Sequence, residues 1–430
     1  MDISEIYPLF LKHPIISTNS RNCPPNSIFF ALKGEKFDGN EYIEMALKNG
    51  ASYAIGDSDN IVEKANIIKV ENSLHTLQEL AQYHRKQLNV KVIAITGTNG
   101  KTTTKELIAC ALSSKYKTLY TSGNLNNHIG VPLTLLRLTH EHQYAIIEMG
   151  ANHIGEIHEL CQIADPDYGI ITNIGKAHLE GFGSLEGVIR AKTELYDFMR
   201  KKGGTVFGNL DNLILKDLYD YLTMVYYGTT SEAYIHGQIL KSEPTLSLRW
   251  FKGKEKNEIT THLAGTYNFE NVLAAVCIAS YFEVENHLIN NAIENYFPQN
   301  NRSQNLKTNK NQLIVDTYNA NPSSMGAALD NFLAMSISPK MVILGQMNEL
   351  GNYTVEEHKK IIDLLQKNNI EKVFLIGKNF QILNRYPENW KLFPKTEELL
   401  EYLNSENIKG YNILIKGSRG NKLEEAIPYL

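Results

Sequence analysis

VIAITGTNGKTTTKELIACAL (Val92–Leu112) is the stretch that decides the fold of the middle of this chain, because it predicts a strand, a glycine-rich loop and a helix. Gly97 and Gly100 let backbone N–H groups turn around an anion, and the following helix directs its positive end at it. Lys101 would reach the β- and γ-phosphates of a nucleotide, and the Thr102 hydroxyl would ligate Mg²⁺. The GxxGKT spacing is shorter than the standard phosphate loop, so an ordinary turn is the alternative. The flanking strand and helix favour nucleotide binding.

Two long regions around and beyond this stretch alternate short β-branched runs with helical patterns, which is typical of parallel sheets. The runs are apolar on both faces, as strands buried between helices are. They are KVIAIT (Lys91–Thr96), YAIIEMG (Tyr144–Gly150) and YGIITNIG (Tyr168–Gly175), then QLIVDTY (Gln312–Tyr318), KMVILG (Lys340–Gly345), KVFLIG (Lys372–Gly377) and YNILIKG (Tyr411–Gly417).

A polar, Asn-rich segment, Pro298–Gln312, separates the two regions and predicts an inter-domain linker or long loop. A smaller unit with mixed signals comes first: a strand in Ser27–Gly34, a helix in Glu41–Gly50 and an amphipathic helix in Ser73–Leu88. We therefore predict an α/β protein with a small α/β N-terminal domain (1–88), a central P-loop ATPase domain with a parallel sheet (89–298) and a C-terminal Rossmann-like α/β domain (299–430).

Composition excludes several classes of protein. The 430 residues carry 43 Lys and Arg against 47 Asp and Glu, so there is no basic excess for nucleic acid or an anionic membrane. The 4 cysteines form no CxxC pair, which argues against a zinc site or a disulfide framework. The N-terminus is a poor secretory signal, and no run of apolar residues is long enough to span a bilayer. We expect a cytoplasmic protein without membrane insertion.

Three further polar residues have open interpretations from their local sequence. Glu148 ends a buried strand, which is costly without a cation partner, but it also fits a capping or loop acid. His178 follows another strand and is compatible with an ordinary loop histidine. Lys192 looks like a solvated helical lysine.

Taken together, these pieces resemble the Mur ligases, the ATP-dependent amide-bond-forming enzymes of peptidoglycan precursor synthesis. The resemblance runs through nearly the whole chain in the same order. It rests on SIFFALKGEKFDG (Ser27–Gly39), GTNGKTTTK (Gly97–Lys105), SGNLNNHIGVPLTLL (Ser122–Leu136), EMGANHIGEI (Glu148–Ile157), TNIGKAHLEGFGS (Thr172–Ser184), AKTELYD (Ala191–Asp197), NLD (Asn209–Asp211), GTYNFENVLAA (Gly265–Ala275), VDTYNANPSSM (Val315–Met325), LGQMNELG (Leu344–Gly351) and KGSRGNKLE (Lys416–Glu424).

The resemblance implies a role for each matching residue. Lys101, Lys192 and His178 are expected to be catalytic, and Lys192 is expected to be carbamylated by CO₂, which turns it into an oxygen ligand for a hard cation. The implied metal ligands are Thr102, Glu148, His178 and Lys192. The implied ATP-binding residues are Gly97, Thr98, Asn99, Gly100, Lys101, Thr102, Thr103, Asn268, Asn271, Arg302 and Asp316. The implied substrate-binding residues are Ser27, Lys33, Asp38, Asn124, Asn127, Asn319 and Asn321.

YNANP and LGxMxELG favour the family member that adds D-alanyl-D-alanine to UDP-N-acetylmuramoyl-tripeptide through an acyl phosphate, using ATP and two Mg²⁺ ions. We expect a monomer. Tyr267, Thr317 and Gln346 stand where His and two Asp are usual, which affects the expected details of dipeptide binding. The alternatives are another carboxylate–amine ligase of the superfamily, adding the third residue or polyglutamylating folate, and a nucleotide-gated binding protein.

Overall fold

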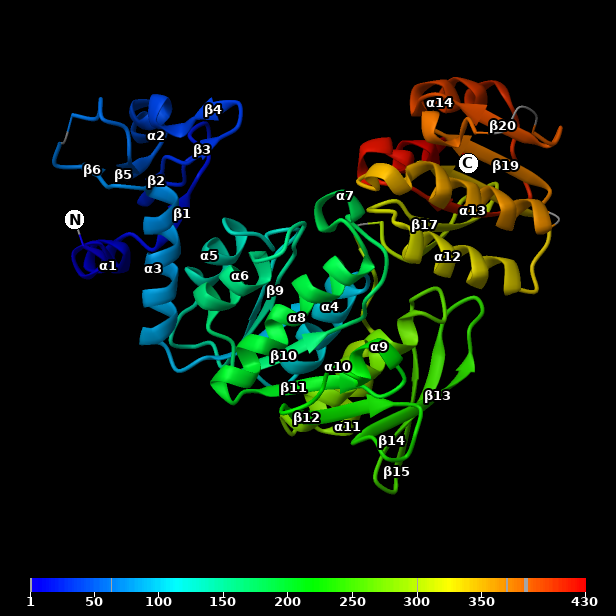
Figure 1. Ribbon diagram of the computed structural model, residues 1–430, viewed down its shortest axis with the longest axis horizontal. Helices are drawn as coiled ribbons and strands as arrows, with labels where there is room; N and C mark the ends of the chain where they lie inside the picture. The colour runs from blue at the N-terminus through cyan, green and yellow to red at the C-terminus, as the bar shows by residue number, and fades with distance from the viewer. Residues whose placement is uncertain (1, 63, 300, 369, 383–385) are drawn as a thin grey trace.

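The computed structural model describes residues 2–62, 64–299, 301–368, 370–382 and 386–430, and in it the chain forms three α/β bodies arranged in chain order (Figure 1). The N-terminal body has a parallel sheet in the order β1-β2-β5-β6. Its elements are α1 (Ile3–Lys12), β1 (Ile15–Ser17), β2 (Ser27–Phe30), β3 (Lys33–Gly34), β4 (Phe37–Asp38), η1 (Gly39–Tyr42), α2 (Ile43–Lys48), β5 (Ala51–Gly56), β6 (Ile67–Lys69) and α3 (Ser73–Gln87).

The central body is built on a sheet in the order β15-β14-β13-β12-β11-β10-β7-β9-β8, parallel from β13 to β8 and antiparallel from β13 to β15. Its elements are β7 (Lys91–Thr96), α4 (Lys101–Ser113), β8 (Thr118–Tyr120), α5 (Gly130–Leu135), β9 (Tyr144–Glu148), α6 (Glu156–Ala164), β10 (Tyr168–Ile171), α7 (Leu179–Phe182), α8 (Leu185–Lys202), β11 (Thr205–Asn209), α9 (Leu213–Lys216), β12 (Thr223–Gly228), β13 (Ile235–Lys241), β14 (Ser247–Lys252), β15 (Glu255–Thr260), α10 (Asn268–Tyr281) and α11 (Asn286–Glu294).

The C-terminal body has a sheet in the order β16-β17-β21-β18-β19-β20, parallel except for the edge strand β16. Its elements are β16 (Gln304–Lys307), β17 (Gln312–Asp316), α12 (Pro322–Ala334), β18 (Lys340–Gly345), η2 (Gly351–Tyr353), α13 (Thr354–Lys367), β19 (Lys372–Ile376), η3 (Lys378–Phe380), β20 (Trp390–Phe393), α14 (Thr396–Ser405), β21 (Asn412–Lys416), η4 (Arg419–Asn421) and η5 (Leu423–Tyr429).

The α/β fold class and the predicted buried strands are confirmed, but the linker prediction is wrong in part. Asn300 lies outside the described residues, and Gln304–Lys307 form β16, which pairs antiparallel with β17. Polar residues are tolerated there because β16 is an edge strand, and Asn305 and Lys307 are exposed.

Strand order places the site in the central body. The chain runs from β7 to β8 and β9 on one side and to β10 on the other, so strand order reverses at β7. Ligands of open α/β sheets bind at the carboxyl ends of strands at such a point. Lys101 begins α4 there, after a left-handed Gly100.

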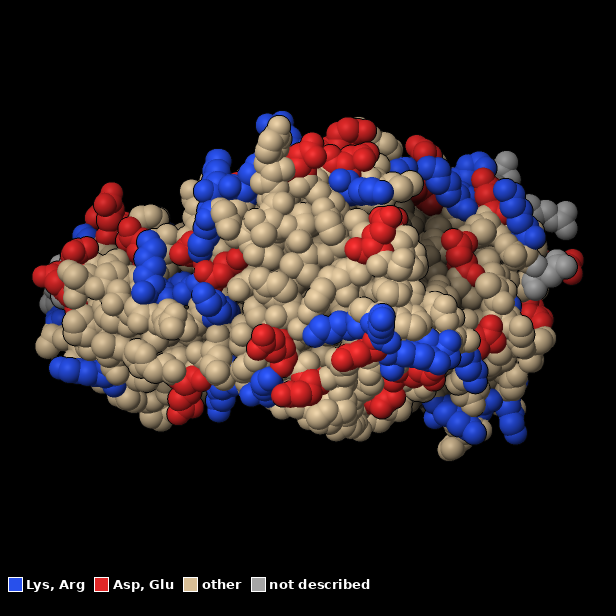
Figure 2. Space-filling model, turned by 90° about the horizontal axis from the view of Figure 1, so that it is seen from below, with Lys and Arg blue, Asp and Glu red and all other residues tan. Residues whose placement is uncertain are grey.

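The helices and the surface charge bear on what a membrane or a polyanion would require. Within the described residues, we find no helix with the length and apolar character that crossing a bilayer requires. On the face shown in Figure 2, acidic and basic side chains are interspersed.

Candidate functional site

The loop between β7 and α4 has the geometry of an anion cradle. Gly97 and Gly100 adopt φ angles of +145° and +78°, which favour glycine. A Cβ on Gly97 would lie 1.9 Å from Thr172 Oγ1, and a Cβ on Gly100 would lie 2.5 Å from Asn271 Oδ1. Lys101 Nζ donates to the loop carbonyls of Gly97 at 2.6 Å and Thr98 at 3.0 Å. Glycine is therefore required at both positions, because of the backbone conformation and because a Cβ would collide with a neighbouring side chain.

This loop opens onto a cavity of about 800 Å³ between the central and C-terminal bodies. Most of the site residues expected from the sequence line it: Thr98, Asn99, Gly100, Lys101, Thr102, Thr103, Asn124, Asn127, Glu148, His178, Asn268, Asn271, Arg302, Asp316, Asn319 and Asn321. Gly97, Lys192, Ser27, Lys33 and Asp38 are outside its lining.

Glu148, at the end of β9, is buried next to the loop helix. Its Oε1 accepts from Thr102 Oγ1 at 3.2 Å and from Asn126 Nδ2 at 2.9 Å. Its Oε2 lies 3.7 Å from the Nζ of Lys105, which is also buried. Among the described residues, neither Oε2 nor this Nζ has a hydrogen-bond partner.

Sequence reasoning missed Asn126 and Lys105. Lys105 follows Lys101 by four residues, so both project from one face of α4, which was an available signal. Asn126 lies in the SGNLNNHIG motif next to Asn127, so its position in that motif was also an available signal.

Lys192 is buried on α8, with 1% of its surface exposed, so the interpretation as a solvated lysine is wrong. Val188, Ala191, Leu195 and Lys192 share the buried face of the helix, and this helical spacing was readable in the sequence. Its Nζ lies 5.6 Å from the centre of the Phe182 ring. Burial, together with the charge of Lys101, lowers the pKa of Lys192 well below its ordinary value. Burial also lowers the pKa of Lys101, to about 8, against the opposing charge of Glu148.

His178 contacts a residue of the C-terminal body. Its Nδ1 is paired with Oε2 of Glu349, and this hydrogen bond holds the pKa of Glu349 below its ordinary value. Glu349 lies in the LGQMNELG motif and lines the same cavity, but sequence reasoning gave it no role.

Two asparagines of α10 form a hydrogen-bonded chain to the helix that follows the phosphate loop. Asn271 Nδ2 donates to Asn268 Oδ1 at 2.9 Å, and Asn271 Oδ1 accepts from Thr104 Oγ1 at 3.0 Å. Tyr267, at the position where His is usual, shares a 3.0 Å hydrogen bond with Ser303 Oγ of the C-terminal body.

The C-terminal body contributes residues from the carboxyl ends of β17 and β21. Asp316 Oδ2 lies 2.5 Å from Lys416 Nζ, which also donates to the carbonyl of Asn319 at 3.2 Å. The Arg302 guanidinium lies 3.6 Å from the centre of the Tyr318 ring.

Asn321 joins this segment directly to the phosphate loop, because its Nδ2 donates to Asn99 Oδ1 at 2.8 Å.

Two positions where Asp is usual in the family have other residues here. At the first, Gln346 Oε1 accepts from the backbone N–H of Asn379 at 3.3 Å. Thr317 Oγ1 is buried without a hydrogen-bond partner in the described part of the chain.

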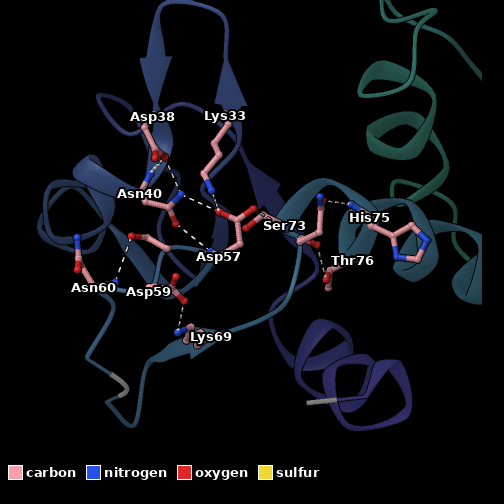
Figure 3. A network of polar contacts seen from close by, with 12 residues as sticks. Lys33, Asp38, Asn40, Asp57, Asp59, Asn60, Lys69, Ser73, His75 and Thr76 are labelled. Carbon is pink, nitrogen blue, oxygen red and sulfur yellow. Dashed lines mark hydrogen bonds and ion pairs between the residues drawn. The ribbon is translucent and has the colours of Figure 1, made fainter.

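The expected substrate residues of the N-terminal body are absent from the cavity lining, and two of them, Lys33 and Asp38, belong to a polar network around Asp57 (Figure 3). Lys33 Nζ pairs with Asp57 Oδ1 at 3.0 Å, and Asp38 Oδ1 accepts from Asn40 Nδ2 at 2.6 Å. Ser27 is buried on β2. The body therefore offers a second polar site at a distance from the phosphate loop.

The donors present fit a nucleotide with a hard cation. A Cβ at Gly100 would collide with the Asn271 side chain, so the loop keeps glycine there and its backbone N–H groups are free of a neighbouring Cβ. Glu148 Oε2, which accepts no hydrogen bond within the described residues, and the Thr102 hydroxyl are oxygen ligands of the kind Mg²⁺ prefers. The described residues contain no group of three or more His, Cys, Asp or Glu side chains that could hold a metal ion.

Comparison with known proteins matches all three bodies. Residues 13–91 match the Mur ligase family, catalytic domain; residues 95–279 match the Mur ligase middle domain; and residues 301–419 match the Mur ligase, glutamate ligase domain. The UDP-N-acetylmuramoyl-tripeptide–D-alanyl-D-alanine ligase of Bacillus subtilis is 33% identical over 422 residues, covering 96% of this chain and 92% of the relative.

Solved structures agree with these matches. A crystal structure of MurF from Acinetobacter baumannii superposes with a TM-score of 0.87 at 31% identity, covering 96% of this chain and 92% of that one. MurF from Thermotoga maritima in complex with ADP gives 0.85 at 25% identity, covering 97% of both chains. Because the family models follow one another along the chain and the identity exceeds 30% over nearly its full length, the chain belongs to the Mur ligase family.

Proposed function

We propose that this protein is an ATP-dependent ligase that joins D-alanyl-D-alanine to UDP-N-acetylmuramoyl-tripeptide in peptidoglycan precursor synthesis. The observation that carries the proposal is the cavity in which the phosphate loop meets the YNANP segment, through the 2.8 Å contact between Asn321 and Asn99. It is supported by relatives that are named for this activity and that match 96% of this chain. We assign the UDP end to residues 1–88, ATP to residues 89–298 and the dipeptide to residues 299–430.

The chemistry requires the substrate carboxylate to be activated, because hydroxide is a poor leaving group at neutral pH. In our proposal the γ-phosphoryl group of ATP is transferred to this carboxylate, and the dipeptide amine then attacks the acyl carbon and displaces phosphate. Such a transfer depends on charge neutralisation and alignment more than on covalent help from the protein. Lys101 leaves its loop carbonyls to contact the phosphates, and Asn268 and Asn271 hold the loop in shape.

Bound Mg²⁺ would neutralise the phosphate charge, and we assign Thr102, Glu148, His178 and carbamylated Lys192 to hold two ions. Carbamylation requires an unprotonated amine to attack CO₂. The lowered pKa of Lys192 favours that unprotonated form. Arg302 and Asp316 are assigned to the nucleotide, and Asn124, Asn127, Asn319 and Asn321 to the growing peptide and the dipeptide.

A phosphate-release assay tests the activity. With ATP, Mg²⁺ and UDP-N-acetylmuramoyl-tripeptide present, D-alanyl-D-alanine should trigger release, and mass spectrometry should detect the pentapeptide product. Faster release with a single amino acid and the UDP-linked dipeptide would favour the third-residue ligase, and release with folate and glutamate would favour the polyglutamylating enzyme. Nucleotide binding without amine-dependent release would favour a binding protein. The cytoplasmic location and the monomeric state stay predictions; sedimentation would measure the second.

A further inference from the structure

The contact between His178 and Glu349 joins two different bodies at the cavity. His178 precedes α7 in the central body, and Glu349 lies between β18 and η2 in the C-terminal body; Figure 1 shows α7 beside that body. Glu349 Oε2 is paired with His178 Nδ1, and the Glu349 carbonyl accepts from the backbone N–H of Glu180 at 3.1 Å. Glu349 therefore holds the loop around His178 by its side chain and by its backbone.

Both residues have backbone conformations that favour glycine. The φ angle is +49° at His178 and +60° at Glu349. Side chains other than glycine persist there when their surroundings require them, and such positions cluster at functional sites. The side chains of these two residues contact each other, so the two unusual backbone conformations occur at the two ends of one contact.

The pairing fixes which nitrogen of His178 faces a ligand. A carboxylate accepts hydrogen bonds and does not donate them, so Nδ1 carries the hydrogen. In the neutral ring the lone pair is then on Nε2, the arrangement found where a carboxylate orients a metal-binding histidine. The His178 ring lies edge-on to Phe182 at 6.3 Å, and Phe182 also faces Lys192 Nζ. His178 and Lys192 thus share one aromatic neighbour.

Holding the two bodies together is a poor explanation for this pair. The His178 and Glu349 side chains are 26% and 55% exposed, and exposed ion pairs stabilise little. The same interface has a better-buried pair nearby, in which Lys176 Nζ lies 2.8 Å from Glu357, whose side chain is 5% exposed.

We propose that Glu349 is a positioning residue: it orients His178 so that Nε2 is presented to a cation in the cavity. The C-terminal body thereby completes a cation site of the central body when it docks. This inference rests on the ligand role proposed for His178. It adds Glu349 to the residues that shape the cation site, and it makes cation binding depend on docking of the C-terminal body.

The test uses Mn²⁺ binding to the full-length protein with ADP, followed by electron paramagnetic resonance, and turnover as a second readout. The variants are Glu349→Ala, Glu349→Gly, which suits the positive φ, His178→Ala and the double variant Glu349→Ala/His178→Ala. Glu357→Ala is the matched control, since it removes a carboxylate from the same interface without touching His178. Thermal unfolding establishes that each variant is folded.

We expect both Glu349 variants to weaken Mn²⁺ binding about ten-fold or more, as loss of such an orienting partner does. Glu357→Ala should change it less than about two-fold, and the double variant should bind like His178→Ala alone. Equal effects of Glu349→Ala and Glu357→Ala, an additive loss in the double variant, or unaltered binding in His178→Ala would each overturn the inference. Dipeptide-dependent product formation by the unmodified protein tests the proposed function separately.

Discussion

Replacement of Lys105 by Met is expected to destabilise the fold strongly although the new side chain is of similar size. Lys105 Nζ and Glu148 Oε2 lie 3.7 Å apart, and both residues are buried. At an effective dielectric constant of about 20, that separation corresponds to an attraction of roughly 4 kcal/mol. Breaking a buried pair from one side costs about 3–5 kcal/mol, because the other charge is left without compensation. The free energy of unfolding should fall by this amount.

The double variant Lys105→Met/Glu148→Gln shows whether charge is the cause. The amide introduced by Glu148→Gln can keep the oxygen that accepts from Thr102 and Asn126, while neither member of the buried pair remains charged. Urea unfolding followed by circular dichroism should shift to a lower midpoint, by about 1 M or more, in Lys105→Met. Most of that shift should disappear in the double variant. A double variant as unstable as the sum of the two single variants would refute the reasoning and assign the loss to packing.

Three further predictions concern the phosphate loop and Lys192. Gly100→Ala should weaken ADP binding about ten-fold or more, as measured by calorimetry. Gly123→Ala should not, because Gly123 is also left-handed but a Cβ added there meets no described atom within 4 Å. Equal effects of the two substitutions would contradict the steric argument. Because the pKa of Lys101 is about 8 and phosphates favour its charged form, ADP binding should take up protons at pH 8–9 and weaken as pH rises above 8. Calorimetry in buffers of different ionisation enthalpy measures this uptake, which Lys101→Arg should abolish. Lys192→Arg and Lys192→Ala should lose activity by orders of magnitude while folded, and acetate should partly restore Lys192→Ala; near-normal turnover of Lys192→Ala would end the carbamate proposal.

The parts that sequence reasoning predicted correctly are those set by neighbouring residues. The strand, loop and helix from Lys91 to Ser113 follow from local periodicity and from two glycines. Asn126 and Glu349 were missed because their partners, Glu148 and His178, are distant in sequence and are brought to them by packing between elements.

The two wrong interpretations have physical reasons as well. Lys192 was interpreted from the frequency of exposed lysines, although it occupies the apolar face of α8. Gln304–Lys307 is polar because one edge of the sheet faces water, so its composition resembles that of a loop.

Helix α3 (Ser73–Gln87) connects the body that contains the Asp57 network to the body that contains the phosphate loop. It packs against α1 of the N-terminal body and against α5 and α6 of the central body. Its 15 residues span about 22 Å. If the nucleotide end of the substrate is held near Asp57, a stem peptide that is one residue shorter displaces its terminal carboxylate by about 3.5 Å. Reacting atoms must approach within about 3–3.5 Å, so that displacement is enough to prevent phosphorylation. The helix would then act as a molecular ruler, making the length of the peptide, and not only its chemistry, a condition for turnover.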